Sequence, residues 1–212
     1  MKGHWWRNDV DSVPRGMVLL VHGFGEHGAL YDGLGSALAG RSFWAFAVDL
    51  RGFGVSQRRG AFAGQRFLDE LDAHAKDVHA AAQHCLQKVA EAFPGHPAVP
   101  LFLYGHSMGA GAVHKLFTGS AGREVSVQGA VFSGVGDGGE ATGPLENPIV
   151  KAGFKMLYNV VPDMAVGNIE PTDMTQNKAH VQRMLADVWC RASGVFRVAY
   201  IRSCLAEDSQ TD

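Results

Sequence analysis

The segment Leu101-Phe102-Leu103-Tyr104-Gly105-His106-Ser107-Met108-Gly109 decides the fold of this chain. Four apolar residues lead into the pattern Gly-x-Ser-x-Gly, and the residues that follow are rich in glycine and alanine, which predicts the start of a helix. A serine at such a sharp strand-to-helix turn exposes its hydroxyl group and can act as a nucleophile. The pattern alone is weak, so its interpretation depends on the strand and helix around it. We interpret Ser107 as a nucleophile rather than as part of a plain glycine-rich turn.

The composition is that of an ordinary globular protein. The 212 residues are 46% hydrophobic and 19% charged, which fits one domain with one sizeable core. A net charge of −2 argues against a nucleic-acid partner, and no apolar run fits a bilayer span or a secretory signal. Three scattered cysteines predict reduced thiols rather than a disulfide framework or a zinc site: Cys85, Cys190 and Cys204. We expect a cytoplasmic protein. Trp5 and Trp6 could touch a membrane surface, although a half-buried strand explains them better.

Short apolar runs bounded by glycine alternate with helical patterns in the first part of the chain. The runs cover residues 17–21, 43–50, 101–104 and 129–133. Runs this short and apolar throughout predict buried parallel strands. Residues 67–93 repeat apolar side chains at spacings of three and four, which predicts a helix that ends at Pro94-Gly95. The order strand, helix, strand indicates an α/β fold with a mainly parallel sheet.

The pattern changes after about residue 137. Residues 149–161 are apolar at helical spacing, and residues 175–188 predict a further helix. Residues 196–201 fit either a helix or a strand. We therefore expect three parts, a partial α/β core, a helical cap and a frayed tail, at residues 1–136, 137–202 and 203–212.

A second motif, residues 22–28 (His-Gly-Phe-Gly-Glu-His-Gly), directly follows the first of these strands. An oxyanion hole in acyl-transfer enzymes needs two N–H groups that converge on one point. The residue after the nucleophile, Met108, supplies one of them, and we assign the other to Phe24 in this early loop. A third motif, residues 49–56, follows the next strand. We interpret it as structural, because Asp49 precedes the nucleophile and belongs to a neighbouring turn.

These three motifs, HGFGEH, DLRGFGVS and GHSMGAG, resemble in their order and separation the monoacylglycerol lipase branch of the α/β-hydrolase family, also described as serine aminopeptidase-like or lysophospholipase-like. The resemblance covers most of the chain and extends more loosely into the cap. It implies a mainly parallel sheet with helices on both faces and a helical cap over Ser107. It also implies hydrolysis of esters, often lipid esters such as monoacylglycerols, without a metal or an organic cofactor. Ser107 corresponds to the nucleophile, and Phe24 and Met108 to the oxyanion hole.

The chain departs from the family pattern after residue 194. Members place the triad aspartate after a strand beyond the cap and the histidine on a later loop, and no segment here matches either one. The N-terminus also begins within the family's second strand. We therefore expect a chain truncated at both ends that lacks the last strands. Residues 129–133 would then form an apolar edge strand, which favours aggregation.

Two histidines follow Ser107, namely His114 and His180. His114 lies about two helical turns beyond the serine, so its ring should point away from the hydroxyl group. His180 lies in the expected cap, and Asp137 follows the strand next to the nucleophile strand. A substitute triad of Ser107, Asp137 and His180 is conceivable, although it is much weaker than the assignment of the nucleophile.

The remaining histidines have structural interpretations. Histidines in such positions as His22 and His27 more often fix their loop by hydrogen bonds than take part in catalysis. His106 directly precedes Ser107, so its side chain should face away from it. Three others recur every five residues and share no helix face, so we expect no metal site there: His74, His79 and His84.

Two functions remain open, and a third, another reaction on the same fold such as perhydrolysis or amide cleavage, is not separable from the first by sequence. The first is ester hydrolysis through an acyl-enzyme at Ser107, with a small ester or a lipid as the substrate. The second is a truncated, non-catalytic hydrolase-like protein, because the triad acid and base are not evident. Apolar residues of the cap fit an acyl-binding groove, packing of the cap on the core, or both: Phe154, Met156, Leu157, Val160, Val161 and Met164.

Overall fold

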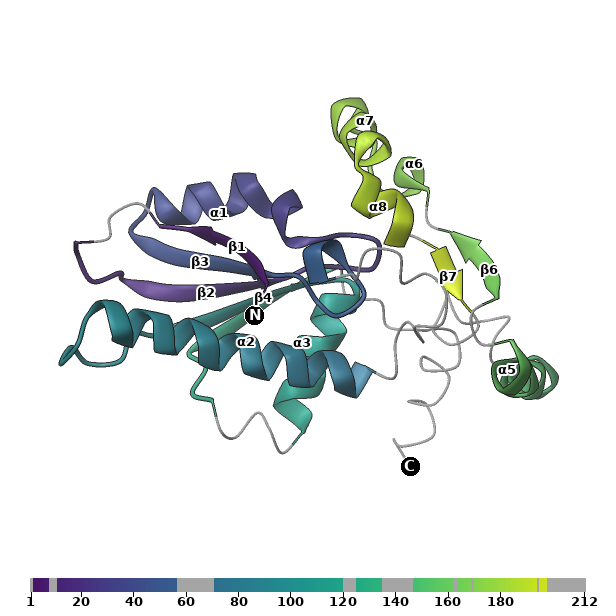
Figure 1. The fold of residues 1–212 in the computed structure, drawn as a ribbon, viewed down its shortest axis with the longest axis horizontal. Helices are drawn as coiled ribbons and strands as arrows, with labels where there is room; N and C mark the ends of the chain where they lie inside the picture. The colour runs from purple at the N-terminus through teal and green to yellow at the C-terminus, as the bar shows by residue number, and fades with distance from the viewer. Residues whose placement is uncertain are drawn as a thin grey trace.

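The computed structural model of the protein describes residues 2–7, 11–56, 71–119, 125–134, 147–161, 164–168, 170–193 and 195–197. Its centre is a five-stranded sheet in the order β1-β3-β2-β4-β5 (Figure 1). The strands are β1 Gly3–Trp6, β2 Gly16–Val21, β3 Phe43–Val48, β4 Leu101–His106 and β5 Gly129–Ser133. β1 runs antiparallel to β3, and all other neighbours are parallel. The mainly parallel sheet and its four strands predicted from apolar runs are confirmed.

Helices cover both faces of this sheet (Figure 1). One face carries α1, Asp32–Ala39, and the other carries α2, Leu71–Ala92, and α3, Met108–Thr118. Two short 3₁₀ helices, η1 Gly28–Tyr31 and η2 Gly54–Ser56, follow β2 and β3. This arrangement is the α/β architecture that the sequence predicted.

The central strand β2 is buried along its whole length because both faces of the sheet are covered. Successive side chains of a strand point to opposite faces. Met17, Leu19 and Val21 pack in the main core with α2 and α3, whereas Val18 and Leu20 pack in the smaller cluster on the α1 side. This explains why the sequence shows a continuous apolar run rather than an alternating one.

α2 has the amphipathic pattern predicted for residues 67–93, although residues 67–70 lie outside the described part of the chain. It ends at Ala92, just before Pro94-Gly95. Gln83 and Gln87 of the predicted polar side are exposed. The predicted apolar stripe is buried at Ala75, Val78, Ala82, Cys85 and Val89.

β5 is an edge of the sheet within the described residues, where it pairs with β4 alone. Its side chains Val131 and Phe132 are 59% and 42% exposed. The apolar edge strand predicted at residues 129–133 is therefore present in the described part of the chain.

The elements after β5 lie to one side of the sheet (Figure 1). They are α5 Pro148–Val160, β6 Ala165–Asn168, α6 Pro171–Met174, α7 Lys178–Ala186, α8 Val188–Ser193 and β7 Val195–Arg197. α5 and α7 match the two predicted helices, and β6 pairs antiparallel with β7. Residues 196–201 fit either a helix or a strand by sequence, and their beginning lies in the strand β7. Residues 198–201 and the expected tail lie outside the described residues. The division into core, cap and tail stays a prediction.

No helix in the described part of the chain is long and apolar enough to cross a membrane.

α3 packs so closely on the end of β2 that only glycine fits at position 109. A Cβ atom on Gly109 would collide with the carbonyl oxygen of Val21 and would lie 2.5 Å from that of His22. Gly105 is similarly constrained, because its Cβ would lie 2.7 Å from the Ala110 Cα atom. The atoms in the way belong to the backbone and cannot swing aside as a flexible side chain can. These contacts fix the place at which the helix begins.

We expect Gly109→Ala to destabilise the protein by about 1–3 kcal/mol, because the added methyl group must push α3 away from β2. The matched control is Gly33→Ala, since a Cβ on this α1 glycine meets no atom within 4 Å. The control should be neutral or stabilising by up to about 1 kcal/mol, as alanine favours helix. Urea denaturation of both variants measures the difference. Equal stabilities would contradict the close packing of α3 on β2.

His74 is a buried, neutral histidine in the first turn of α2. It is 1% exposed, and neither ring nitrogen has a hydrogen-bond partner among the described residues. Its ring packs against that of Phe53, with 6.2 Å between the centroids. Burial lowers the pKa of His74 to about 4, and the nearby negative charge of Asp77 offsets only part of this effect. The folded protein therefore keeps this imidazole uncharged well below neutral pH.

This pKa predicts a loss of stability in mild acid. The unfolded chain takes up a proton at His74 near pH 6.5, so between that value and about pH 4 it binds more protons than the folded chain. The free energy of unfolding should therefore fall by about 2 kcal/mol between about pH 7 and about pH 5 on account of this residue. In His74→Leu this fall in the free energy of unfolding should vanish, whereas the exposed control His114→Gln should retain it. An unchanged pH dependence in urea denaturation of His74→Leu would refute the assignment.

Candidate active site

Ser107 occupies the turn between β4 and α3 in a strained backbone conformation. Its φ is 49° and its ψ is −119°, a combination that costs a non-glycine residue on the order of 1–3 kcal/mol. The turn is held because the Ser107 N–H donates to the Ser133 carbonyl oxygen at 2.9 Å. Its own carbonyl oxygen accepts from the N–H groups of Ala110 and Gly111. Ser107 is exposed, as a nucleophile at the start of a helix must be.

The loop of residues 22–28 lies directly against this serine. A Cβ atom on Gly23 would lie 3.3 Å from the Ser107 Cβ and 3.1 Å from the His106 Cδ2. The two residues that we assigned to the oxyanion hole are the chain neighbours of these contacts, and their role stays a prediction. Phe24 follows Gly23 in the loop, and Met108 is the first residue of α3. The structure therefore brings together the two segments that sequence analysis connected.

A buried carboxylate holds this loop. Glu26 is 7% exposed, and its Oε2 accepts hydrogen bonds from the Gly23 N–H and the Tyr31 hydroxyl, both at 2.8 Å. Burial and the adjacent negative charge of Glu26 raise the pKa of Tyr31 far above its usual range. The other oxygen, Oε1, lies 4.0 Å from His106 Nε2. His106 is thus turned toward Glu26 and toward the Ser133 carbonyl oxygen, 3.2 Å from its Nδ1, as expected for a residue that faces away from the nucleophile.

His22 connects the loop to the segment after β3. Its Nε2 accepts a hydrogen bond from the Leu50 N–H at 3.1 Å, so the proton is on Nδ1, which donates to the Gly23 carbonyl oxygen at 2.8 Å. Burial lowers the pKa of His22 and keeps the ring neutral. Phe53 packs edge-on against the rings of His22 and Phe24. The structural interpretation of His22 agrees with these contacts.

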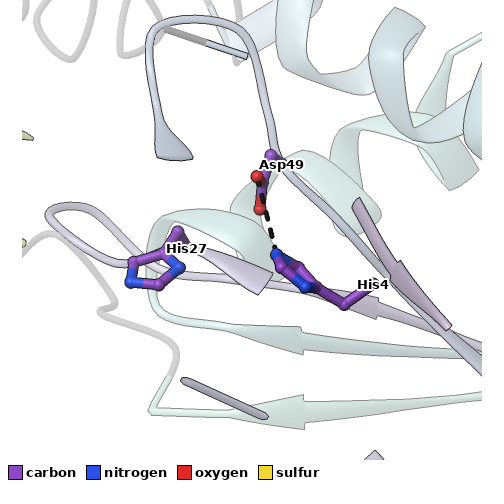
Figure 2. Close-up of side chains that lie close together, drawn as sticks. All are labelled: His4, His27 and Asp49. Atoms are coloured by element: carbon purple, nitrogen blue, oxygen red, sulfur yellow. Dashed lines mark ion pairs between the residues drawn. The ribbon is translucent and has the colours of Figure 1, made fainter. Parts of the chain in front are cut away.

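Asp49 also has a structural role. Its buried carboxylate accepts hydrogen bonds from the Gly28 N–H at 2.7 Å and the Val55 N–H at 2.9 Å. Figure 2 shows this carboxylate in an ion pair with His4, at 3.9 Å, with His27 beside the pair. Asp49 therefore joins the loop of residues 22–28 to the turn after β3, as the sequence interpretation expected.

His27 connects the same loop to the elements after β5. Its Nε2 lies 2.8 Å from Asp187 Oδ2. The other carboxylate oxygen, Oδ1, accepts hydrogen bonds from the N–H groups of Trp189 and Cys190 at the beginning of α8. Asp187 thus caps α8 with one oxygen and binds the loop with the other.

The surroundings of this contact perturb two groups. Burial tends to raise the pKa of Asp187, but the hydrogen bond and charge of His27 outweigh it and lower the pKa. Burial raises the pKa of the Cys190 thiol to about 12. Arg183 of α7 adds a contact just after the loop, because its Nη2 donates to the carbonyl oxygen of Ala29 in η1 at 3.3 Å. The end of α7 thus holds the loop and the beginning of η1.

The sequence analysis included Glu26 in its second motif and Asp187 in a predicted helix but gave neither residue a role. Glu26 had a local signal, because an acid three residues after a glycine can reach back to that glycine's N–H group. Asp187 had none, since its partner His27 is 160 residues away in the chain.

No complete triad occurs within the residues that the structure describes. No described histidine ring makes a hydrogen bond with Ser107. His180 lies in the first turn of α7, where its N–H group donates to Asn177 Oδ1. Asp137 lies outside the described residues, so the triad of Ser107, Asp137 and His180 stays a prediction. His114 is exposed on α3.

Two groups of side chains in the described part of the chain have donor atoms close enough to hold a metal ion. The donor atoms of His4, His27 and Asp49 lie within 4.8 Å of one another, and so do those of His27, Asp187 and Cys190. Sequence analysis predicted neither group, because each one joins residues that are far apart in the chain.

Comparisons with known proteins identify relatives along most of the chain. The family described as serine aminopeptidase, S33, matches residues 12–209. Mouse monoglyceride lipase is 31% identical over 201 residues, which are 89% of this chain and 56% of that protein. The monoacylglycerol lipase of Mycolicibacterium smegmatis is 27% identical over 188 residues, or 86% of this chain and 58% of that protein. The chain thus spans little more than half the length of these curated relatives.

Solved structures agree with the fold. A soluble variant of the Saccharomyces cerevisiae monoglyceride lipase, in complex with a substrate analog, aligns with a TM-score of 0.68 and 22% identity, over 98% of this chain and 64% of that one. The Paleococcus ferrophilus monoacylglycerol lipase aligns with a TM-score of 0.67 and 22% identity, over 99% of this chain and 71% of that one. The resemblance stated from the three motifs is confirmed. The chain belongs to the serine aminopeptidase S33 family and has the α/β-hydrolase fold.

Proposed function

We propose that this chain hydrolyses carboxylic esters through an acyl-enzyme at Ser107, with lipid esters such as monoacylglycerols as substrates. The observation that supports this most directly is the strained, exposed Ser107 between the N-terminus of α3 and the loop at Gly23. Strain is retained where the surrounding structure holds it in place, which is common at active sites. The names of the relatives, monoglyceride lipases from several organisms, support the substrate class.

The reaction follows from this placement. Ser107 Oγ attacks the ester carbonyl carbon while its proton passes to a general base. The carbonyl oxygen becomes an oxyanion, which the N–H groups of Phe24 and Met108 and the positive end of the α3 dipole would stabilise. The carbon–oxygen bond to the alcohol breaks, the alcohol takes up the proton, and the acyl group remains on Ser107. Water then attacks the acyl-enzyme, releases the carboxylic acid and restores the serine.

The reaction needs a general base to take the proton of the Ser107 hydroxyl group. His180, oriented by Asp137, is our candidate base, as the sequence interpretation has it. The alternative is a non-catalytic hydrolase-like protein, and one observation favours it, namely that no described histidine ring is bonded to Ser107. The two functions differ in whether the Ser107 hydroxyl is activated.

We expect Ser107→Ala to reduce hydrolysis of a short p-nitrophenyl ester by at least about a thousandfold, because the nucleophile is lost. Ser36→Ala, at an exposed position of α1, is the matched control and should be fully active. A fluorophosphonate probe should label the wild-type chain once per molecule and should not label Ser107→Ala. Wild-type hydrolysis no faster than that of Ser107→Ala, without labelling, would establish the non-catalytic alternative.

His180→Gln tests the base separately. If His180 is the base, the variant should lose most of the activity while the exposed control His114→Gln retains it, because a base contributes about 10²–10⁴-fold to the rate. Equal rates for the two variants would remove His180 from the proposal and leave Ser107 in place.

The apolar face of α5 bears on the substrate. Met156 and Val160 are each 71% exposed, so packing on the core does not explain these two side chains. Ile149 is 81% exposed on the same helix. We infer that they contact the acyl chain of a lipid ester.

The double substitution Met156→Gln with Val160→Gln should lower kcat/KM for a long-chain monoacylglycerol by about 5–30-fold, which corresponds to losing about 1–2 kcal/mol of apolar contact. Hydrolysis of p-nitrophenyl acetate should not change, because its acyl chain is too short to reach α5. Lys155→Gln, also exposed on α5, is the control. A double variant that loses activity on both substrates alike would argue against acyl contact.

A further inference from the structure

Three different metal-ligand donors converge where the loop of residues 22–28 meets α8. A ring nitrogen of His27, a carboxylate oxygen of Asp187 and the thiol sulfur of Cys190 all lie within 4.8 Å of one another. His27 and Cys190 are each 5% exposed, and the Asp187 side chain is 21% exposed. Two of these ligand atoms, on His27 and Asp187, form a hydrogen bond with each other, and the Cys190 thiol is not part of that bond.

The spacing is close to that of a tetrahedral site. Bond lengths of about 2.0–2.3 Å to nitrogen, oxygen and sulfur place the ligand atoms about 3.3–3.6 Å apart around one ion. His27 Nε2 and Asp187 Oδ2 are now 2.8 Å apart, so they would need to separate by about half an ångström. The Cys190 sulfur lies within 4.8 Å of a ligand atom on each of these two residues and would need to move closer to reach this spacing.

The surroundings orient the donors. Asp187 Oδ1 caps α8, and this leaves Oδ2 directed at His27. Asp187 and Cys190 are three residues apart at the start of α8, so their side chains lie on one side of the chain. Figure 2 shows one ring nitrogen of His27 facing the Asp49 and His4 pair and the other facing away from it. A carboxylate on the far side of a histidine ring is the usual second partner of a metal-bound imidazole.

We propose that His27, Asp187 and Cys190 form a binding site for a divalent transition-metal ion, with Zn²⁺ as the best chemical fit, which joins the loop beside Ser107 to α8. A nitrogen, oxygen and sulfur donor set matches zinc, whereas Mg²⁺ and Ca²⁺ require oxygen ligands. The ion displaces the protons of His27 Nε2 and the Cys190 thiol, which pass to solvent. The site is structural and does not take part in ester hydrolysis.

The other group, His4, His27 and Asp49, is a weaker alternative because it shares His27 with the proposed site. Both oxygens of Asp49 already accept hydrogen bonds, from Gly28 and Val55. A metal ion on Asp49 would compete with these bonds for the carboxylate oxygens. Asp49 is therefore less suited than Asp187 to act as a ligand.

Cobalt(II) titration of the full chain tests the site, because a cobalt–thiolate bond gives an intense near-ultraviolet charge-transfer absorption. We expect saturation at one ion per chain, and loss of the band in Cys190→Ser. Cys85→Ala, which removes the other described buried thiol, is the matched control and should keep the band. Asp187→Asn retains an oxygen to cap α8 but loses the anionic ligand, so it should weaken binding by about 10-fold or more. Circular dichroism establishes that each variant is folded.

Thermal unfolding gives a second, independent measurement. Zn²⁺ at about a hundredfold excess over its Kd should raise the Tm of the wild type by roughly 5–10 °C and leave that of Cys190→Ser unchanged. The proposal is wrong if no thiolate band forms, if the band persists in Cys190→Ser, or if Zn²⁺ raises the Tm of both proteins equally. Probe labelling of Ser107 is unaffected by any of these outcomes, so the site and the proposed hydrolysis fail separately.

Discussion

The contact between the first turn of α3 and the carboxyl end of β2 is the constraint on which the site depends. Gly109 rests on the carbonyl oxygens of Val21 and His22, and no side chain fits between them. Because the helix begins there, the backbone at Ser107 is forced into a positive φ. The same contact brings the end of β2, and with it the loop of residues 22–28, against the serine. One close backbone approach thus positions both Ser107, the candidate nucleophile, and the loop proposed to bind an oxyanion.

The polar residues around this contact form hydrogen bonds that position the loop of residues 22–28. Glu26 holds the Gly23 N–H group, His22 bridges to Leu50, and Asp49 binds two N–H groups near η2. Buried polar groups need such partners, since each one left unpaired costs about 1–3 kcal/mol. A backbone held at several points reorganises little when charge develops nearby, which is what an oxyanion hole requires. The His27–Asp187 contact extends this support to α8.

Much of the fold could be predicted because its signals are local. The four apolar runs became β2 to β5, and the stripe from Ala75 to Val89 became the buried face of α2. In a parallel sheet covered on both faces, burial alone selects apolar residues, so the strands are visible without knowing their neighbours. The short strand β6 was not predicted, because four residues carry too little periodicity, and β1 was anticipated only as a half-buried strand at Trp5 and Trp6. The candidate site was predicted only where its signals are local. Ser107 and the loop at Gly23 carry local glycine patterns, whereas Asp187 carries no such pattern.

The sequence by itself determined the fold class and the family resemblance and predicted Ser107 as the candidate nucleophile, because glycine spacing and apolar runs act over a few residues. The tertiary structure alone decided which polar groups meet. It paired His27 with Asp187 across 160 residues and placed Cys190 beside them. It also left His74 buried without a hydrogen-bond partner and assigned Asp49 to backbone N–H groups. Such contacts depend on how whole helices and strands pack against one another, and a short stretch of sequence does not predict that packing.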